Sequence, residues 1–251
     1  MKNVLSLYEP IEAYKPFADN IGIVDGPIEY LSWLTIKIPF PTRMTVVRLV
    51  NGDLFLHSPI AFDARLANRL QSMGTIRHLV SPNKLHYAHI EEWALAFPQA
   101  ITWASPGVRE RARTHGIDVH FRRDLSADAP AEWHGQIDQT IIPGSFMDEV
   151  VFFHKESKTL ILADTIENSE PDKIRQPYRF LVKLSGAYHP YGKMPIDLRS
   201  TFWPKKRAVK DAIERISSWQ PERITLCHGR CYDRNGNNEI RRAFRWAIGS
   251  R

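Results

Sequence analysis

The order of the apolar runs constrains the fold of this chain more than any other feature of its sequence. Two hairpin patterns stand out: 44–59, whose apolar runs flank Asn51-Gly52-Asp53, and 148–165, whose turn is Lys-Glu-Ser-Lys. In each half of the chain the hairpin comes first, and strand and helix patterns alternate after it. This order predicts an α/β sandwich of mixed sheets with helices on the outer faces, rather than one doubly wound parallel sheet.

The spacing of apolar residues predicts the remaining elements. Helical patterns cover 62–73, 88–97, 106–115, 170–184, 205–219 and 238–248, and short buried strands are expected at "IRHLVSP", "AITWAS" and "RITLCHG". Residues 1–40 are rich in Pro and aromatics and only weakly periodic, so irregular structure with short strands is expected there. Pro and Gly make 185–203 a predicted loop. Residues 1–251 are expected to form a single domain with a substantial core.

The composition narrows the class of protein. Of the 251 residues, 43% are hydrophobic and 25% are charged, as in an ordinary soluble globular protein, and no apolar run approaches the length of a membrane span. The first residues make a poor secretory signal, so a cytoplasmic protein is predicted. Cys227 and Cys231 lie one residue further apart than a Cys-x-x-Cys pair, which indicates two reduced thiols near one strand end.

The charge of the chain suggests anionic partners. Its net charge is +6 and its pI about 9.3, which raises the hypothesis of a nucleic-acid binder. The basic residues are dispersed, however, and the densest groups, "WPKKRAVK" and "IRRAFRW", fall on amphipathic helical patterns. Without an aromatic and basic stripe for single strands, nucleic-acid binding ranks low. An anionic small substrate or an anionic surface remains open.

Metal-capable side chains follow three of the predicted strands. His86 and His89 come after "HLVSP", Asp164 after "TLILA", and His228 after "RITLC". Loops at strand ends converge on a rigid sheet edge, and three imidazoles with one carboxylate suit zinc, iron or manganese. The two histidines, three residues apart, would face one way on the first turn of a helix. Each residue alone is better explained as a cap or turn residue, but together they predict a metal site.

These stretches resemble a known superfamily. "SPNKLHYAHIEEW" and "FFHKESKTLILADT" are similar to the metallo-β-lactamase-like superfamily, and more closely to the DUF4336 family within it. The resemblance extends from the hairpin at Met44 to the strand at His228. It implies a four-layer αββα fold with two mixed sheets. The superfamily signature is Thr-His-x-His-x-Asp-His after a strand, followed by a later His, a strand-terminal Asp and a final His.

Laid on this chain, the signature falls on "NKLHYAH". Asn83 stands for the Thr and Lys84 for the first His. His86 matches the second His, Ala88 replaces the Asp, and His89 matches the last His.

The later parts of the signature are also partly kept. The later His should fall near Ser145, where the chain has none, while Asp164 and His228 match the strand-terminal Asp and the final His. The family site holds two metals, and this chain keeps too few ligands for two. Lys84 would also repel a cation in its place. The resemblance therefore implies at most one divalent metal (zinc, iron or manganese), held by His86, His89, Asp164 and His228.

Three residues are candidates for catalytic roles. Asp164 is the would-be bridging carboxylate. Glu149, or its neighbour Asp148, is expected to replace the acid lost at Ala88, as ligand or base, although an exposed loop acid is the simpler explanation for either. Lys84, with Arg230, would hold an anion at the mouth of the site. His154, near the hairpin turn, is expected on the surface.

Two functions follow. One is a mononuclear metal-dependent hydrolase acting on a small anionic or ester-like substrate, whose identity the sequence leaves open. The other is a metal-free binding or regulatory protein in which the same side chains form an internal hydrogen-bond network and Lys84 pairs with Asp164. The fold does not decide between them, and the oligomeric state is left open.

Overall fold

Seven strands form the first sheet of the protein. The computed structural model describes residues 4–33 and 36–249, and the side chains among them outside 31–38. The strands lie in chain order: β1 (Tyr14–Ala18), β2 (Ile21–Trp33), β3 (Ile36–Arg48), β4 (Asp53–His57), β5 (Thr75–Ser81), β6 (Ile101–Ala104) and β7 (Arg123–Asp124). Pairing is antiparallel from β1 to β4 and parallel from β4 to β7, so the sheet is mixed.

Four strands form the second sheet, in the order β11-β10-β9-β8. They are β8 (Ile137–Ile142), β9 (Glu149–His154), β10 (Thr159–Ile161) and β11 (Arg223–Thr225). The pairs β8–β9 and β9–β10 are antiparallel, whereas β10 and β11 are parallel. Both predicted hairpins are therefore confirmed, as β3–β4 and β9–β10.

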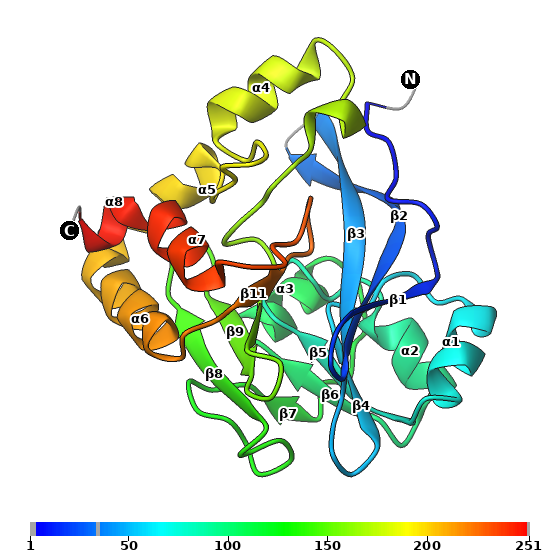
Figure 1. The fold of residues 1–251 in the computed structure, drawn as a ribbon. Coiled ribbons are helices and arrows are strands. Elements are labelled where there is room, and N and C mark those ends of the chain that lie inside the picture. The colour runs from blue at the N-terminus through cyan, green and yellow to red at the C-terminus, as the bar shows by residue number, and fades with distance from the viewer. Residues whose placement is uncertain (1–3, 34–35, 250–251) are drawn as a thin grey trace.

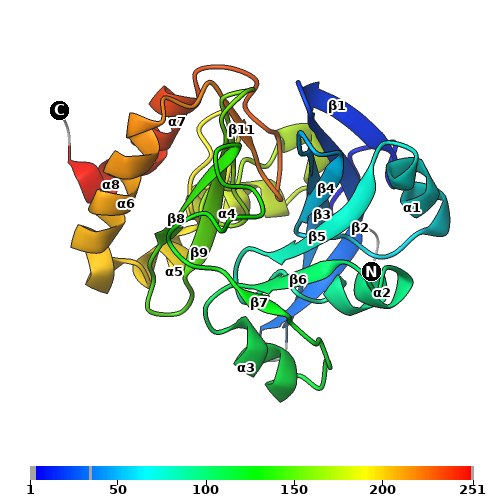
Figure 2. The same ribbon diagram turned by 90° about the horizontal axis from the view of Figure 1, so that it is seen from below.

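Helices cover the outer face of each sheet (Figure 2). On the first sheet these are α1 (Ala64–Gln71), α2 (Ile90–Ala96) and α3 (Val108–Thr114). On the second they are α6 (Lys206–Ser218), α7 (Gly236–Ala243) and α8 (Arg245–Ile248). The predicted α/β sandwich of two mixed sheets between helical layers is confirmed.

Alternation along the strands explains the layers. In β4, Leu54 and Leu56 pack toward α1 and α2, while Phe55 between them packs into the core between the two sheets. Phe152 of β9 enters this central core from the second sheet, and its ring lies 5.2 Å from that of Phe55. A third core lies between the second sheet and the C-terminal helices.

Local sequence signals set several boundaries. Asp63 caps α1, because its carboxylate accepts the amide of Leu66 at 2.8 Å. In the first hairpin, Asn51 Oδ1 accepts the amide of Asp53, and Gly52 between them has a φ of +86°. In α6, Val209 and Ile213 are buried while Lys206 is exposed, so this basic segment is a solvated helix face.

The N-terminal segment differs from the expectation of irregular structure over residues 1–40. β2 and β3 are the longest strands, with 13 residues each, and they pair along most of their length. A register shift between Asp25 and Ile28 takes up Gly26 and Pro27, and this β-bulge hides the regular alternation in the sequence.

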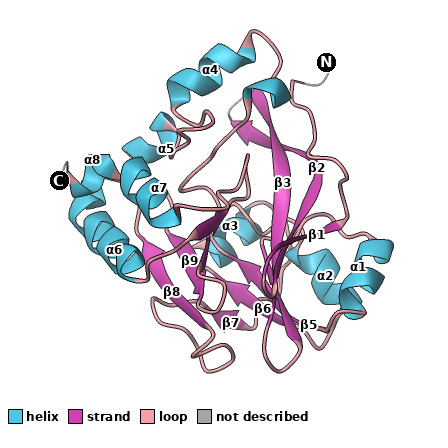
Figure 3. Ribbon diagram, in the orientation of Figure 1, coloured by secondary structure: helices cyan, strands magenta, loops and turns pink. Residues whose placement is uncertain are grey.

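The segment between β10 and β11 also differs in detail. The helix expected over 170–184 is reduced to α4 (Tyr178–Ser185), preceded by a single 3-10 turn at Pro171–Lys173. The loop expected over 185–203 contains the short helix α5 (Ile196–Ser200) and the start of a second 3-10 turn, Trp203–Lys205. Figure 3 shows α4 and α5 set apart from both sheets, which is why their apolar residues lack the periodic burial of α6.

His154 is not on the surface. It is the last residue of β9, which lies between β8 and β10, and only 3% of it is exposed. Its Nδ1 lies 2.8 Å from the hydroxyl of Ser157. Among the described helices, none has both the length and the apolarity needed to cross a membrane.

Candidate metal centre

Four strand ends meet at one edge of the sandwich. β4 and β5 run parallel in one sheet and β10 and β11 run parallel in the other, so each pair ends on the same side. Ser58 follows β4, His86 lies in the loop after β5, Asp164 follows β10, and His228 follows β11. The topology thus brings together side chains that are distant in the sequence.

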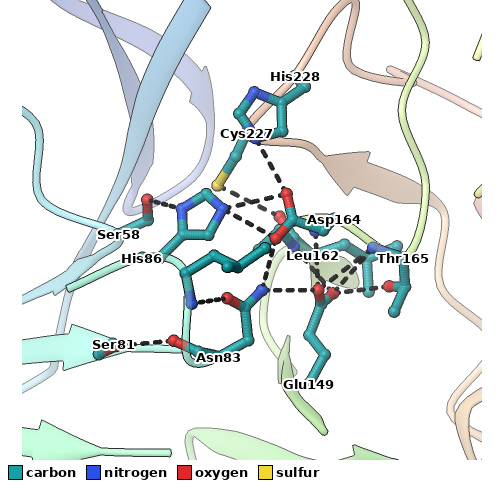
Figure 4. A network of polar contacts seen from close by, with 12 residues as sticks. Ser58, Ser81, Asn83, His86, Glu149, Leu162, Asp164, Thr165, Cys227 and His228 are labelled. Carbon is teal, nitrogen blue, oxygen red and sulfur yellow. Dashed lines mark hydrogen bonds and ion pairs between the residues drawn. The ribbon is translucent and has the colours of Figure 1, made fainter. Parts of the chain in front are cut away.

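Asp164 lies between two imidazoles (Figure 4). Its Oδ1 is 3.1 Å from Nε2 of His86 and 3.0 Å from Nε2 of His228. One ligand atom from each of the three residues lies within 4.8 Å of the others. All three side chains are nearly buried, with exposed fractions between 6% and 12%.

The outer nitrogens of the two imidazoles are held by other elements. His228 Nδ1 lies 2.9 Å from the carbonyl oxygen of Pro41 on β3. Because a carbonyl only accepts, this nitrogen carries a proton, and Nε2 is left to face Asp164. His86 Nδ1 lies 2.6 Å from the hydroxyl of Ser58, whose backbone φ is +55°. Both rings therefore turn Nε2 toward the same point.

The charges of the three groups support one another. Burial alone would lower the pKa of His86, but the Asp164 carboxylate raises it well above its usual value. The pKa of His228 is raised in the same way, against the effect of burial. Burial would raise the pKa of Asp164, yet the two imidazoles hold it well below its usual value. Each of the three groups thus stabilises the charged form of its neighbour.

Glu149 holds the backbone on which Asp164 sits. The carboxylate of this fully buried residue accepts the amides of Ala163 at 3.0 Å and Asp164 at 2.7 Å. It also accepts the amide and the hydroxyl of Thr165, the latter at 2.6 Å. Burial and the nearby Asp164 carboxylate raise the pKa of Glu149. Through these hydrogen bonds Glu149 holds the backbone of the turn after β10 in place.

Asn83 joins the two carboxylates. Its Nδ2 donates to Asp164 at 2.8 Å and to Glu149 at 3.1 Å, while its Oδ1 accepts the amide of Leu85. It is fully buried. Asn83, which stands where the superfamily signature has Thr, therefore holds the loop that carries His86 against the turn that carries Asp164.

His89 does not join this group. It precedes the first residue of α2, and its ring nitrogens lie 3.4 Å from Glu92 and 3.5 Å from Glu29. The expectation that His86 and His89 share a helix face depended on both lying in the helix. His86 lies in the turn before it, so the three-residue spacing does not align them.

Lys84 also points elsewhere. Its Nζ lies 4.0 Å from the centre of the Phe146 ring, and among the described residues no ion pair joins it to Asp164. The salt bridge expected for a metal-free protein is thus not present.

Arg43 anchors the loop that carries His228. This buried guanidinium pairs with Asp25 at 2.6 Å and donates to the carbonyl oxygens of Leu226, at 2.9 Å, and Gly229. The two carbonyls flank His228 in the sequence. Arg43 and Pro41 thus hold both the backbone and the ring of His228 from one strand, β3.

Two further residues near the centre were not found from the sequence. Burial would raise the pKa of the Cys227 thiol, but the imidazoles of His86 and His57 hold it well below its usual value. Burial raises the pKa of Glu167 to about 7; the carboxylates of Asp164 and Asp197 add to this, and the two imidazoles of the centre oppose it. The position of Cys227 next to His228 was the only sequence signal for either.

The donor set fits a single divalent ion. Two imidazole nitrogens and one carboxylate oxygen are the ligands of catalytic zinc sites of the His₂Glu type, which leave a further position for water or substrate. The outer partners Pro41, Ser58 and Asn83 orient all three ligands, as is usual around bound metals. The group of His86, Asp164 and His228, which could hold such an ion, is called the metal centre for brevity.

Comparisons with known proteins agree on the fold. A family model described as a domain of unknown function, DUF4336, matches residues 31–184. No curated protein matches the sequence. Among solved structures, the DIM-1 metallo-β-lactamase is similar with a TM-score of 0.60 and 16% identity, over 98% of this chain and 100% of that one.

Two further structures share this similarity. The FIM-1 metallo-β-lactamase from Pseudomonas aeruginosa, in its mono-zinc form, has a TM-score of 0.57 and 13% identity, over 95% of this chain and 96% of that one. The Flv1 flavodiiron core from Synechocystis has a TM-score of 0.61 and 10% identity, over 98% of this chain and 62% of that one. At these identities the likeness shows the metallo-β-lactamase fold.

Proposed function

The chain belongs to the DUF4336 family, and we propose that it is a metal-dependent hydrolase with one divalent ion held by His86, Asp164 and His228. The observation that carries the proposal is the meeting of these three ligand atoms within 4.8 Å, at the strand ends of a fold shared with metallo-β-lactamases. Zinc, iron and manganese all suit the donor set. A small anionic or ester-like molecule is the proposed substrate, and the cytoplasm the proposed location.

The protein's own groups prepare the centre for this role. When bound, a divalent ion supplies Lewis acidity and lowers the pKa of a coordinated water to about 7. Pro41 and Ser58 hold the two imidazoles with Nε2 inward, so little reorganisation is needed on binding. Glu149 and Asn83 keep the Asp164 carboxylate in place without contributing to the three-ligand group themselves.

Glu167 is the acid–base group of this proposal. Ala88 occupies the position of the signature's Asp, so this chain lacks that carboxylate. Glu167 follows Asp164 by three residues, interacts electrostatically with all three ligands, and has a pKa of about 7. A carboxyl group with this pKa exchanges protons readily at neutral pH. Glu149, by contrast, uses its oxygens on the backbone and on Thr165.

A metal-free binding protein is the second candidate. This candidate is favoured because the polar groups of the centre are already paired with one another. Asp164 accepts hydrogen bonds from both imidazoles and from Asn83. Such a network is stable by itself, because buried polar groups with partners are not penalised.

Metal content distinguishes the two. Purified protein is stripped with a chelator and dialysed against zinc, iron(II) or manganese, and bound metal is measured by elemental analysis. We expect one equivalent with at least one ion, and hydrolysis of p-nitrophenyl acetate or p-nitrophenyl phosphate above that of Asp164→Asn. Less than about 0.2 equivalents with every ion would favour the metal-free protein.

The role of Glu167 has its own test. Glu167→Gln is expected to lower kcat while metal affinity stays within about threefold, because the group is not among the three ligands. Asp172→Asn, an exposed acid on the same segment, is the matched control. Unchanged kcat in Glu167→Gln would remove Glu167 from the mechanism.

A further inference from the structure

A groove of about 490 Å³ lies beside α3. One wall is α3 with the residues before it, and the other is the 144–148 loop that leads into β9. Lys84 lines the groove two residues before His86, and Asp148 lines it one residue before Glu149. Of the three residues of the metal centre, His86 thus lies in the same loop as a residue that lines the groove.

The acidic residues of the groove already have cationic partners. Asp148 accepts the amide of Gly144 at 3.0 Å and lies 3.5 Å from Nζ of Lys205. Glu110 pairs with Arg113 at 2.8 Å along α3. Each acidic side chain of the groove is thus paired with a cation other than Lys84 and Arg111.

The remaining cations of the groove are Lys84 and Arg111. Within the described part of the chain, neither forms an ion pair with a carboxylate. Lys84 lies over the ring of Phe146, with its Nζ 4.0 Å from the ring centre. Lys84 Cδ lies 4.0 Å from the position that a Cβ on Gly107 would take, and Arg111 lies one helical turn beyond Gly107 in α3. The two cations are therefore neighbours in the groove that both of them line.

We propose that Lys84 and Arg111 bind the phosphate group of a small molecule in this groove. An anion between them would pair with both charges, neither of which forms an ion pair with a carboxylate among the described residues. That this molecule is the substrate rests on the proposed function; the anion site itself does not.

A phosphate fits these two residues better than a carboxylate does. A phosphate group carries about two charges and several acceptor oxygens, enough for an ammonium and a guanidinium approaching from separate walls. A monocarboxylate balances only one of the two cations. Phe146, Met147 and Pro106 also line the groove and offer apolar contact for the rest of the molecule.

The test measures inorganic phosphate binding to metal-free protein by calorimetry, with acetate as the comparison anion. Metal-free protein is required because phosphate also binds metal ions directly. We expect saturable phosphate binding, at least about tenfold tighter than acetate, and at least about tenfold weaker in Lys84→Met and in Arg111→Met. The affinity should fall as salt is added, because the site is partly exposed.

Matched controls lie outside the groove. Arg48→Met and Lys155→Met each remove one exposed cation of the same type and should bind phosphate as the unaltered protein does. In Asp164→Asn, phosphate binding should persist although metal binding is lost, so failure of the metal centre is distinguishable from failure of the groove.

A titration of the unaltered protein followed by amide NMR shifts keeps the test independent of the variants. Shifts concentrated at Lys84, Arg111 and Ser145 are expected. Equal affinity for phosphate and acetate, shifts elsewhere, or unchanged binding in both groove variants would overturn the proposal.

Discussion

The metal centre and the Lys84–Arg111 groove share a loop, yet their charges are satisfied in different ways. In the centre, Asp164 is buried between two imidazoles, and each ring is held from behind by Pro41 or Ser58. In the groove, Lys84 and Arg111 are partly exposed and lack a carboxylate partner in the described chain. The buried centre suits a metal ion that replaces the protons on the two imidazoles. The partly exposed pair of cations suits an anion that binds reversibly.

The largest effect is expected for a ligand of the centre. Asp164→Asn removes the charge that both imidazoles face, and metal affinity should fall by more than about a hundredfold, beyond the loss typical for an outer partner. His89→Gln should leave the affinity within about threefold, because His89 faces Glu29 and Glu92 instead. Competition titration with a chromogenic chelator measures both. Equal losses in the two variants would contradict the three-ligand centre.

The next effect separates two neighbouring acids. Glu149→Ala leaves buried amides and the Thr165 hydroxyl without an acceptor and should lower the free energy of unfolding by about 3 kcal/mol or more. Asp148→Ala, at the partly exposed start of the groove, should cost less than about 1 kcal/mol. Urea denaturation gives both values. If Glu149→Ala folds and its free energy of unfolding equals that of the unaltered protein, Glu149 is not needed to hold the backbone of residues 163–165.

The pH dependence of metal binding follows from the histidines. The raised pKa of His86 means that a proton must leave before Nε2 accepts an ion, so affinity falls as the pH is lowered. Between about pH 5 and pH 6.5 the affinity should drop roughly tenfold or more per pH unit. A pH-independent metal affinity would be inconsistent with this picture.

The smallest effect concerns the support of His86. Ser58→Ala removes the hydroxyl 2.6 Å from Nδ1, and metal affinity should fall roughly tenfold while the protein stays folded. Ser72→Ala, on an exposed turn after α1, is the control. If both variants bind metal equally well, the ring orientation is set by packing alone.

The fold was largely predictable from the sequence, because its signals are local and periodic. Alternation of apolar residues and Asn51-Gly52-Asp53 indicated the hairpins, and helical spacing of apolar residues indicated the helices that cover the sheets. The long strands β2 and β3 were not predicted, because a β-bulge and several prolines interrupt the alternation of apolar and polar residues. The bounds of α4 and the presence of α5 were not predicted, because these helices lie apart from the sheets and lack a regular buried face.

The candidate site was predictable only in outline. Metal-capable residues at strand ends indicated His86, Asp164 and His228, since parallel strands end on one side. The direction in which His89 points depends on the residue at which α2 begins. The pattern of apolar residues does not determine that boundary to within one turn. Ser58 and Asn83 act through contacts between distant segments, which no spacing reveals. The raised pKa of Glu167 results from its burial, which no sequence pattern indicated.

Anomalous diffraction from crystals grown with zinc tests the metal centre most directly. We expect one strong peak about 2.0–2.2 Å from Nε2 of His86, Nε2 of His228 and an oxygen of Asp164. No peak at this point with zinc in excess, or a peak held instead by His89, would contradict the account.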